Sequence, residues 1–282
     1  MTGKKEWAEL SIDRTDDSGM KSACSAHAEA RCEGMAVTTE YDQRCAAEFV
    51  RLQHRVDRYF VELKTECPYG LPYIARFYQA MFGPLTDRAM ELFLAAGYRR
   101  NGNCLYAMRC HECQGCIPIR LRPKLFQPNR TQRRIAKKNC DIEVRFDRVN
   151  MDRENLDLCG RFLEARYPQE YNSADGYYGG FFCNSIVDSM RVEFRLDGQL
   201  VGGSIIDLGE SWMNAVYFYF DPDESRRSLG TFNILTLIDL CLEFGIEYLY
   251  LGYYIPDVRA MSYKQKFRPH ELFENGIWHL AD

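Results

Sequence analysis

The chain is 282 residues long and 46% hydrophobic, enough to bury a full core as one large domain or as two closely packed halves. Its formal net charge of −4 argues against a generally basic nucleic-acid binder. Met1 to Leu10 lacks the apolar stretch of a signal peptide, and no apolar run is long enough to cross a bilayer. We therefore expect a cytoplasmic protein without membrane segments.

The first half of the chain predicts an irregular start followed by short elements. Residues 1–45 are rich in Ser, Ala and acidic residues and lack periodic apolar positions, which indicates a poorly ordered or peripheral extension. Capping residues, breakers and an Asn-Gly turn then predict, in order, a helix over 87–96, a hairpin of strands 98–100 and 104–108, a strand over 116–121, and helices over 129–138 and 152–166.

The second half predicts a meander, a helix and a last strand. Alternating apolar positions and Gly-containing turns predict strands over 190–196, 199–207 and 211–220, an apolar helix over 229–244, and a buried strand over 248–253. This order is typical of acyltransferases of the GNAT type, so we expect an α+β fold with a mixed, largely antiparallel sheet and flanking helices. Those enzymes bind pyrophosphate on a loop of pattern Arg/Gln-x-x-Gly-x-Gly/Ala. Arg227 to Phe232 matches only its first part, and a loop that merely caps a helix explains it equally well.

Three cysteines stand at the spacing C-x2-C-x2-C, namely Cys110, Cys113 and Cys116. In a reducing compartment, such close spacing suggests metal binding or catalysis rather than disulfides. Cys67 could supply a fourth thiolate, and four thiolates suit tetrahedral zinc or an iron–sulfur cluster, the spacing favouring the cluster. Cys104 and His111 could substitute, so the ligand set stays open. Free buried thiols are the alternative.

The stretch from Arg120 to Lys138 holds eight Lys or Arg residues and no acid. Five cations of its predicted helix fall at i, i+3, i+4, i+7 and i+8 and so share one face: Arg130, Arg133, Arg134, Lys137 and Lys138. Like charges at these spacings repel by a few tenths of a kcal/mol per pair unless a polyanion covers them. Together with Arg120 they predict a nucleic-acid surface. A solvated face neutralised by neighbouring acids is the alternative.

Nine blocks of the sequence carry a further signal. They are Cys67-Pro68-Tyr69, Ala96 to Gly102, Cys113 to Arg120, Phe126 to Arg134, Tyr219 to Asp223, Arg227 to Thr231, Tyr250 to Ile255, Met261 to Lys264, and Phe267 to Leu272. In this order they resemble the arginyl- and leucyl-tRNA protein transferases of the N-end rule pathway. The resemblance covers nearly everything from about residue 60 onward and follows the family pattern only loosely over 166–182, which leaves acceptor preference open.

The resemblance implies a transferase that moves leucine from charged tRNA onto the α-amine of proteins beginning with Asp or Glu, marking them for degradation. Arginine as the donated residue stays open, and neither CoA nor a nucleotide cofactor is expected. We expect a peripheral extension over 1–45, a cysteine-containing subdomain with the basic helix over 46–145, and a GNAT-like catalytic domain over 146–282. Eukaryotic members are linked to an iron–sulfur cluster or metal on the equivalent cysteines, with C-x-x-C at the first site, where this chain has Gly70.

The chemistry asks for few groups, because an aminoacyl ester is already activated. The catalytic candidates are the backbone N–H groups of Gly230 and Thr231 and the side chains of Tyr253, Tyr254 and Lys264, with packing as the alternative role of each tyrosine. An acidic acceptor asks for a cation, for which the candidates are Arg76, Arg99 and Arg226. An acetyl-CoA-dependent acyltransferase and a non-catalytic, metal-dependent RNA-binding module remain as other functions. The sequence does not indicate an oligomeric state.

Overall fold

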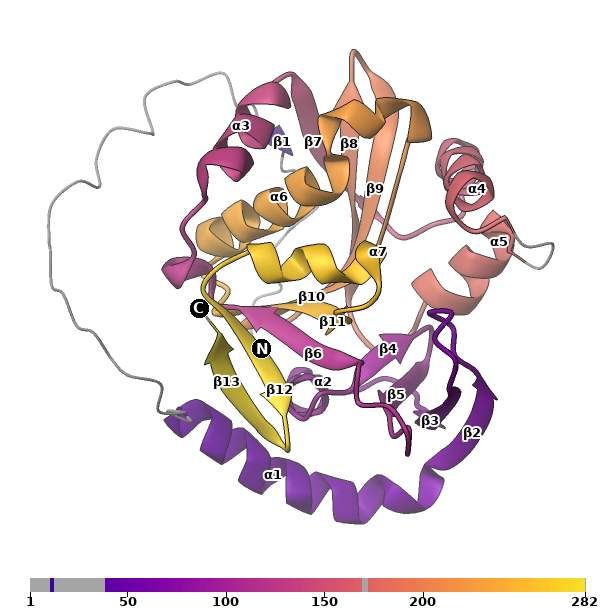
Figure 1. Ribbon diagram of the computed structural model, residues 1–282, viewed down its shortest axis with the longest axis vertical. Helices are drawn as coiled ribbons and strands as arrows, with labels where there is room; N and C mark the ends of the chain where they lie inside the picture. Colours follow the sequence, from indigo (N-terminus) through magenta and orange to yellow (C-terminus); the bar gives the residue numbers. More distant parts are fainter. Residues whose placement is uncertain (1–10, 13–38, 169–171, 282) are drawn as a thin grey trace, which may run out of the picture.

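The computed structural model describes residues 11–12, 39–168 and 172–281 and contains two sheets (Figure 1). Nine strands form a large sheet in the order β1-β7-β8-β9-β10-β11-β6-β12-β13, and four form a small antiparallel sheet in the order β2-β3-β5-β4. The large sheet comprises β1 (Ser11–Ile12), β6 (Ile117–Leu121), β7 (Ile142–Arg148), β8 (Ser189–Leu196), β9 (Gln199–Leu208), β10 (Trp212–Phe220), β11 (Tyr248–Tyr254), β12 (His270–Glu274) and β13 (Ile277–Ala281). The small sheet comprises β2 (Val61–Glu66), β3 (Ile74–Met81), β4 (Arg99–Asn101) and β5 (Cys104–Met108).

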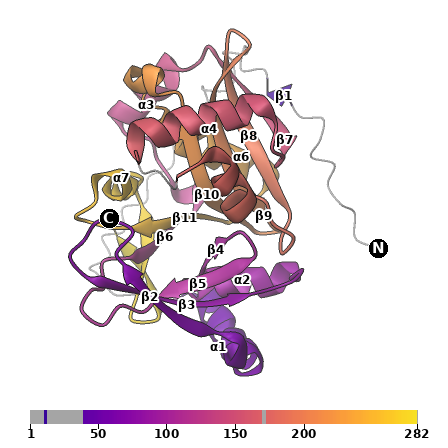
Figure 2. The same ribbon diagram turned by 90° about the vertical axis from the view of Figure 1, so that its right-hand side faces the viewer.

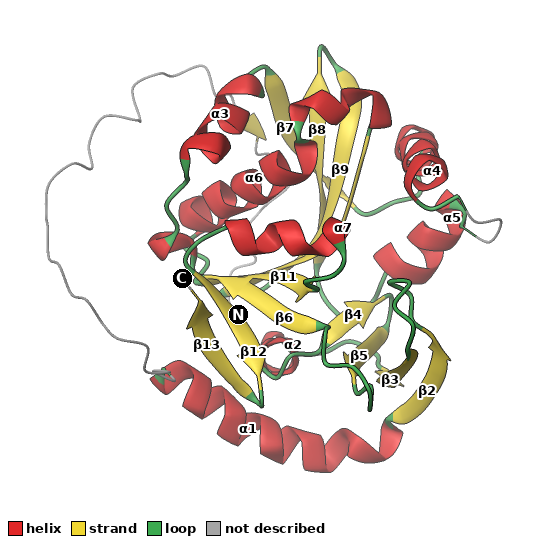
Figure 3. Ribbon diagram, viewed as in Figure 1, coloured by secondary structure: helices red, strands yellow, loops and turns green. Residues whose placement is uncertain are grey.

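Helices flank both sheets (Figure 3). They are α1 (Glu40–Val56), α2 (Asp87–Ala95), α3 (Arg130–Lys138), α4 (Arg153–Arg166), α5 (Ala174–Tyr177), α6 (Leu229–Phe244) and α7 (Arg259–Ser262). Short 3-10 turns are η1 (Asp57–Tyr59), η2 (Pro123–Leu125), η4 (Pro222–Arg227) and η5 (Tyr263–Lys266), and η3 (Tyr178–Phe182) is a π-helical turn. No helix in the described ranges is long and apolar enough to span a bilayer.

The large sheet has a core on each face. Helix α6 contributes Phe232 and Leu237 to one cluster, which Val201 and Ile206 join from β9. Helix α4 lies over the opposite face, where its buried apolar residues meet Tyr219 of β10. Strands β10 and β11 are parallel because α6 crosses between them, whereas the other pairings given for the described strands are antiparallel.

A third cluster joins α1, α2 and one face of the small sheet, with α1 running beneath that sheet (Figures 1 and 2). The small sheet is also tied to the large one by a buried ion pair. Arg100 of β4 donates from Nε and Nη2 to both carboxylate oxygens of Asp207 on β9, at 2.8 and 2.6 Å. The small sheet is therefore held against the large sheet rather than attached through a free linker.

Strand β6 changes the expected division of the chain. It lies in the segment 46–145, yet it pairs with β11 on one side and β12 on the other. Helix α1 begins at Glu40, so residues 40–45, expected in the peripheral extension, form its first turns. Most of the remaining extension lies outside the described residues.

Most sequence predictions of single elements are confirmed, including α2, the β4–β5 hairpin, β6, α3, α4, the β8–β10 meander, α6 and β11. Asn129 and Gln132 form a reciprocal capping box at the start of α3. Gly245 ends α6 in the left-handed conformation that glycine favours, with φ +71°. Strands β2, β3, β7, β12 and β13 and helix α1 were not predicted.

Candidate functional site

Strands β10 and β11 separate along their length. They pair only from Trp212 with Tyr248 to Asn214 with Tyr250, although both continue further. The β11 register with β6 is also interrupted between Tyr250 and Tyr253, where Gly252 has φ +81°. This interruption frees backbone carbonyls of β11 from the ladder, at the point where the two strands diverge.

Two buried cations donate hydrogen bonds to these carbonyls. Arg99 of β4 donates from Nη2 to the Gly252 carbonyl at 2.8 Å, and Lys264 of η5 donates from Nζ to the Tyr253 carbonyl at 2.9 Å. Arg99 is 4% exposed and Lys264 is 9% exposed. No carboxylate in the described part of the chain forms an ion pair with either cation, and the Arg99 Nε is buried without a hydrogen-bond partner there. Buried charges are normally paired, so these two cations can accommodate an anionic group.

Tyrosines surround Arg99. Its guanidinium carbon lies 5.5 Å from the ring centre of Tyr253 and 5.9 Å from that of Tyr250, while Tyr69 and Tyr106 are further electrostatic neighbours. Burial raises the pKa of Tyr106 to about 12 and raises the pKa values of Tyr69 and Tyr253 well above their usual range. All these hydroxyls therefore stay protonated near neutral pH and can donate hydrogen bonds.

The environment also sets the protonation of Lys264. Burial, and then the positive charge of Arg99, lower its pKa to about 7. A lysine with this pKa is partly neutral at cellular pH and can accept a proton. A side chain at Gly252 would be strained by the positive φ, and its Cβ would lie 3.7 Å from Lys264 Nζ, so glycine fits this approach.

The other predicted catalytic groups lie in different settings. Tyr254 points away from Tyr253 along the strand, and its hydroxyl donates to Gln265 Oε1 at 3.2 Å. At the start of α6, the Thr231 N–H donates to the Ser228 carbonyl at 3.0 Å, so this N–H does not have the free role predicted for it. A Cβ on Gly230 would lie 4.0 Å from the hydroxyl of Tyr263, a half-buried residue that was not among the predicted catalytic groups.

Of the three predicted acceptor cations, Arg99 alone contacts Tyr253 in the structure described. Arg76 pairs through Nη1 with Glu62 at 2.9 Å on the small sheet. Arg226 is exposed, and its carbonyl accepts a hydrogen bond from Lys138 at 2.8 Å. Tyr69 and Tyr106 were missed because they became neighbours of Arg99 only through folding.

The five predicted cations of α3 are all exposed: Arg130, Arg133, Arg134, Lys137 and Lys138. Arg133 donates to the Pro128 carbonyl and Lys138 to the Arg226 carbonyl. None of the five forms an ion pair with a carboxylate of the described residues. We call these five residues the basic face.

Arg120 does not belong to the basic face, which corrects the sequence prediction. It is fully buried, and its guanidinium pairs with Asp42 of α1 at 2.7 Å and Glu271 of β12 at 2.5 Å. The aromatic rings of Tyr248 and Trp278 also lie against it. Its acidic partners are distant in sequence, so a search of 120–138 alone could not find them.

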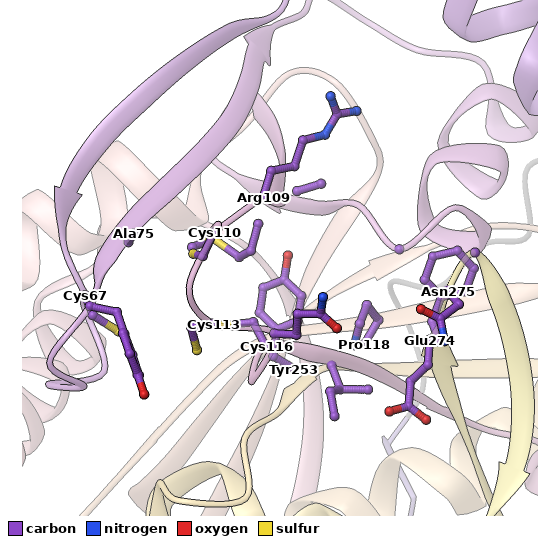
Figure 4. Close-up of a pocket in the computed structure, with 18 of the residues that line it drawn as sticks. Cys67, Ala75, Arg109, Cys110, Cys113, Cys116, Pro118, Tyr253, Glu274 and Asn275 are labelled. Atoms are coloured by element: carbon purple, nitrogen blue, oxygen red, sulfur yellow. The ribbon is translucent and has the colours of Figure 1, made fainter.

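Cys67, Cys110, Cys113 and Cys116 line one cavity of about 410 Å³, together with Tyr253 (Figure 4). The pKa of Cys116 is raised to about 12, first by burial and then by the neighbouring thiols. Cys110 Sγ accepts a hydrogen bond from the Arg76 N–H, and Cys113 Sγ from the Gly115 N–H, each at 3.4 Å. No three of these sulfurs lie within 4.8 Å of one another in the described structure. We call this space the cysteine cavity.

One acidic group has metal-like spacing, formed by Asp147, Asp152 and Glu193. Arg191 Nη2 already lies among them, at 2.8, 2.8 and 2.9 Å respectively. The guanidinium supplies the positive charge that a cation would bring, so this group is a structural ion network.

Sequence comparisons with known proteins agree on one family. Residues 65–134 match the family model described as arginine-tRNA-protein transferase, N terminus, and residues 154–274 match its C terminus. An aspartate/glutamate leucyltransferase from Pseudomonas fluorescens (strain Pf0-1) is 38% identical over 184 residues, covering 64% of this chain and 78% of that protein. One from Chromobacterium violaceum is also 38% identical, covering 64% and 76%. The solved structure of L-PGS from Bacillus licheniformis is 13% identical with a TM-score of 0.40, covering 72% of this chain and 66% of that one.

Proposed function

The chain belongs to the arginine-tRNA-protein transferase family, and from this premise we propose that it transfers leucine from leucyl-tRNA to the α-amine of polypeptides that begin with Asp or Glu. The names of the relatives support leucine over arginine as the donated residue. The preference for acidic acceptors is supported by the buried Arg99, which lies beside Lys264 and has no carboxylate partner in the described structure. An acidic side chain of the acceptor would supply the missing anion.

The reaction replaces one bond to the carbonyl carbon with another. The acceptor nitrogen attacks the ester carbonyl, the C–O bond to the ribose breaks, and the proton lost by nitrogen goes to the ribose oxygen. Lys264 has a pKa of about 7, and an N-terminal amine has a pKa of about 8, so Lys264 can accept this proton and return it to the leaving oxygen. The protonated hydroxyls of Tyr253 and Tyr263 are donors for the oxyanion.

The basic face is the proposed contact for the tRNA backbone. Its five cations lack carboxylate partners in the described structure, and each phosphate contact would release a condensed counterion. Helix α3 packs on α6, and Lys138 reaches the Arg226 carbonyl next to the start of α6. A tRNA on this face would therefore run toward the helix terminus where Gly230 and Tyr263 meet.

We relate the catalytic sheet to the GNAT type because β10 and β11 are parallel, diverge after Asn214 and Tyr250, and are joined by α6. A divergence of this kind leaves room for an acyl group between two strands. The proposed function further implies a cytoplasmic location, where charged tRNA is available, and a role for the transferred leucine in marking proteins for degradation.

The cysteine cavity is the proposed metal site. The C-x2-C-x2-C spacing supports an iron–sulfur cluster held by Cys67, Cys110, Cys113 and Cys116, which line this cavity together. Such a group would fix the 110–116 loop against Tyr253, which lines the same cavity.

Elemental analysis of protein purified without oxygen tests this assignment. We expect iron and acid-labile sulfide, and we expect Cys113→Ala to lose them while Cys140→Ala, which changes an exposed cysteine outside the cavity, retains them. If wild-type protein purified without oxygen contains no metal, the proposed metal site is rejected.

Transfer assays test the function itself. The protein is incubated with labelled leucyl-, arginyl- or phenylalanyl-tRNA and with peptides that begin with Asp, Glu, Lys or Ala. We expect leucine to be added to the Asp and Glu peptides, because an Ala terminus leaves the buried cation unpaired at a cost of about 1–3 kcal/mol. A preference for arginyl-tRNA would make arginine the donated residue, and a preference for Lys peptides would revise the proposed acceptor. Acetylation from acetyl-CoA without any transfer from tRNA would overturn the proposal, and tRNA binding without either activity would favour an RNA-binding module.

A further inference from the structure

One face of the small sheet carries exposed and half-buried apolar side chains. Residues alternate between the two faces of a strand, so Tyr78, Leu105 and Ala107 point to the α1–α2 side, where they join a core cluster. The opposite face carries Val61, Leu63, Phe77, Gln79 and Tyr106, which we call the open face. None of these five belongs to a core cluster of the described residues. Val61 and Leu63 are 61% and 49% exposed.

The strand register connects the open face to Arg99. Val61 is opposite Gln79, Gln79 is opposite Tyr106, and Tyr106 is opposite Arg99. Residues directly opposite in antiparallel strands lie on the same face, so these four form one row across the sheet. The row begins at an exposed edge and ends at Arg99, a buried cation that has no carboxylate partner among the residues the structure describes.

Ring contacts give a second, independent connection. The Phe77 and Tyr106 rings lie 5.5 Å apart between centroids, and the Tyr106 and Tyr253 rings lie 6.3 Å apart in an edge arrangement. The guanidinium carbon of Arg99 lies 5.5 Å from the Tyr253 ring centre. An aromatic surface is thus continuous from the middle of the open face to the proposed acceptor site.

We propose that the open face binds the extended N-terminal segment of the acceptor polypeptide, whose first side chain reaches Arg99. This inference rests on the proposed function and adds the surface that holds the acceptor beyond its first residue. An enzyme that reads only that residue needs sequence-tolerant contacts further along. Phe77, Tyr106, Val61 and Leu63 offer apolar area without charge, which suits varied side chains and an extended backbone.

The dimensions of the row set the length of the segment. Three inter-strand steps of about 4.8 Å each separate Arg99 from Val61. An extended peptide advances about 3.4 Å per residue, so about four residues cover this distance. Longer acceptors would then gain nothing further from the open face.

The first experiment measures leucine transfer to Asp-starting peptides of two, three, four, six and ten residues. We expect kcat/KM to rise by about tenfold in total and to level off at about four or five residues, mainly through a lower KM. If all lengths react equally, transfer itself still occurs, so the proposed function stands and the docking surface is rejected. If no length reacts, the proposed function fails.

The second experiment compares Val61→Ser/Leu63→Ser with Ile74→Ser. Ile74 is 54% exposed and lies on the other face of the same sheet, opposite Glu66, which makes it a matched apolar control. We expect the double variant to raise KM for the ten-residue acceptor about fivefold to tenfold, with less than a twofold change for the dipeptide and for leucyl-tRNA. The control should bind both acceptors like the wild type.

Three outcomes would overturn the docking proposal. An equal rise of KM for dipeptide and ten-residue acceptor would show a general disturbance of the site. A rise confined to leucyl-tRNA would make the open face part of the tRNA surface. A change of sedimentation from dimer to monomer would make it a contact between two copies of the chain.

Discussion

Arg99 and Lys264 are unusual because each is buried without a carboxylate partner among the described residues. Burial lowers the pKa of both groups, and the positive charge of Arg99 lowers the pKa of Lys264 further. Such a pair costs stability in the free protein. The cost is understandable if an acidic substrate offsets it on binding.

Lys264→Met should stabilise the free protein while slowing transfer. The pKa of this lysine is lowered from 10.5 to about 7, so between these values the unfolded chain binds a proton that the folded chain lacks. Burial of Lys264 therefore lowers the free energy of unfolding at pH 7, and this destabilisation decreases as the pH rises toward 10.5. We expect a gain on the order of a few kcal/mol in urea denaturation at pH 7 that shrinks at pH 10.

Lys266→Met is the matched control, since Lys266 is exposed two residues further along. It should change neither stability nor transfer rate. If Lys264→Met is no more stable than the wild type at pH 7, Lys264 does not carry the burial penalty described.

Arg99→Gln should remove the preference for acidic acceptors. We expect kcat/KM for an Asp-starting peptide to fall about 100-fold, because a neutral amide cannot form the charge-assisted, bidentate pair. Arg99→Lys should recover part of the loss, since the charge remains without the planar fork. Arg76→Gln, at the arginine paired with Glu62, should leave the Asp-to-Ala preference unchanged. The measurement is the ratio of kcat/KM for peptides that differ only in the first residue.

The sequence predicted the roles of single residues where these depend on neighbours in the chain, and misled where the interaction partners are distant in sequence. Arg99 was among three candidate cations, but only folding brings it beside Tyr69, Tyr106 and Tyr253. Arg120 sits in a run without acids, yet its partners come from α1 and β12. The four cysteines do line one cavity, but their metal content stays a prediction.

At the scale of elements, α3 was predictable because its signals are local. Asn129 and Gln132 cap its start, and its charges repeat with helical spacing. Helix α1 was missed because its buried positions are Asp42, Cys45 and Phe49, which give a weak apolar stripe. Strand β2 was missed although Val61, Leu63 and Thr65 alternate with charged residues, because this alternation covers only six exposed residues.

The basic face gives a prediction at this scale. Arg134→Gln and Lys137→Gln should each weaken tRNA binding and lower the slope of log K against log salt by about one. Arg153→Gln on α4 is the control, because Arg153 is 95% exposed on a different helix. An unchanged salt slope in the double variant would mean that tRNA does not contact these two residues. Affinity is measured across a series of salt concentrations at constant pH.

At the scale of the whole molecule, β6 joins the two halves of the chain. Its neighbours β11 and β12 come from the last quarter of the sequence, and Arg120 on β6 pairs with Asp42 of α1 and Glu271 of β12. No local pattern in the sequence reports such long-range pairing, which is why the division at residue 145 misses it. One buried network therefore fastens α1 to the large sheet.

Asp42→Asn should destabilise the whole fold. It removes one charge from the buried network and leaves Arg120 partly unpaired, which costs about 3–5 kcal/mol. We expect a single thermal transition at a lower Tm by circular dichroism. Asp157→Asn, at an exposed ion pair on α4, should change stability by less than about 1 kcal/mol. Two separate transitions in the wild type would contradict the joint folding of the halves.

The interior position of β6 also bears on how the chain folds during its synthesis. Leu121 leaves the ribosome more than a hundred residues before Tyr248, the start of its neighbour β11. At about 5–20 residues per second, β6 waits on the order of ten seconds without either neighbouring strand. Its apolar residues Ile119 and Leu121, fully buried in the finished sheet, stay available to chaperones or to other nascent chains for that time.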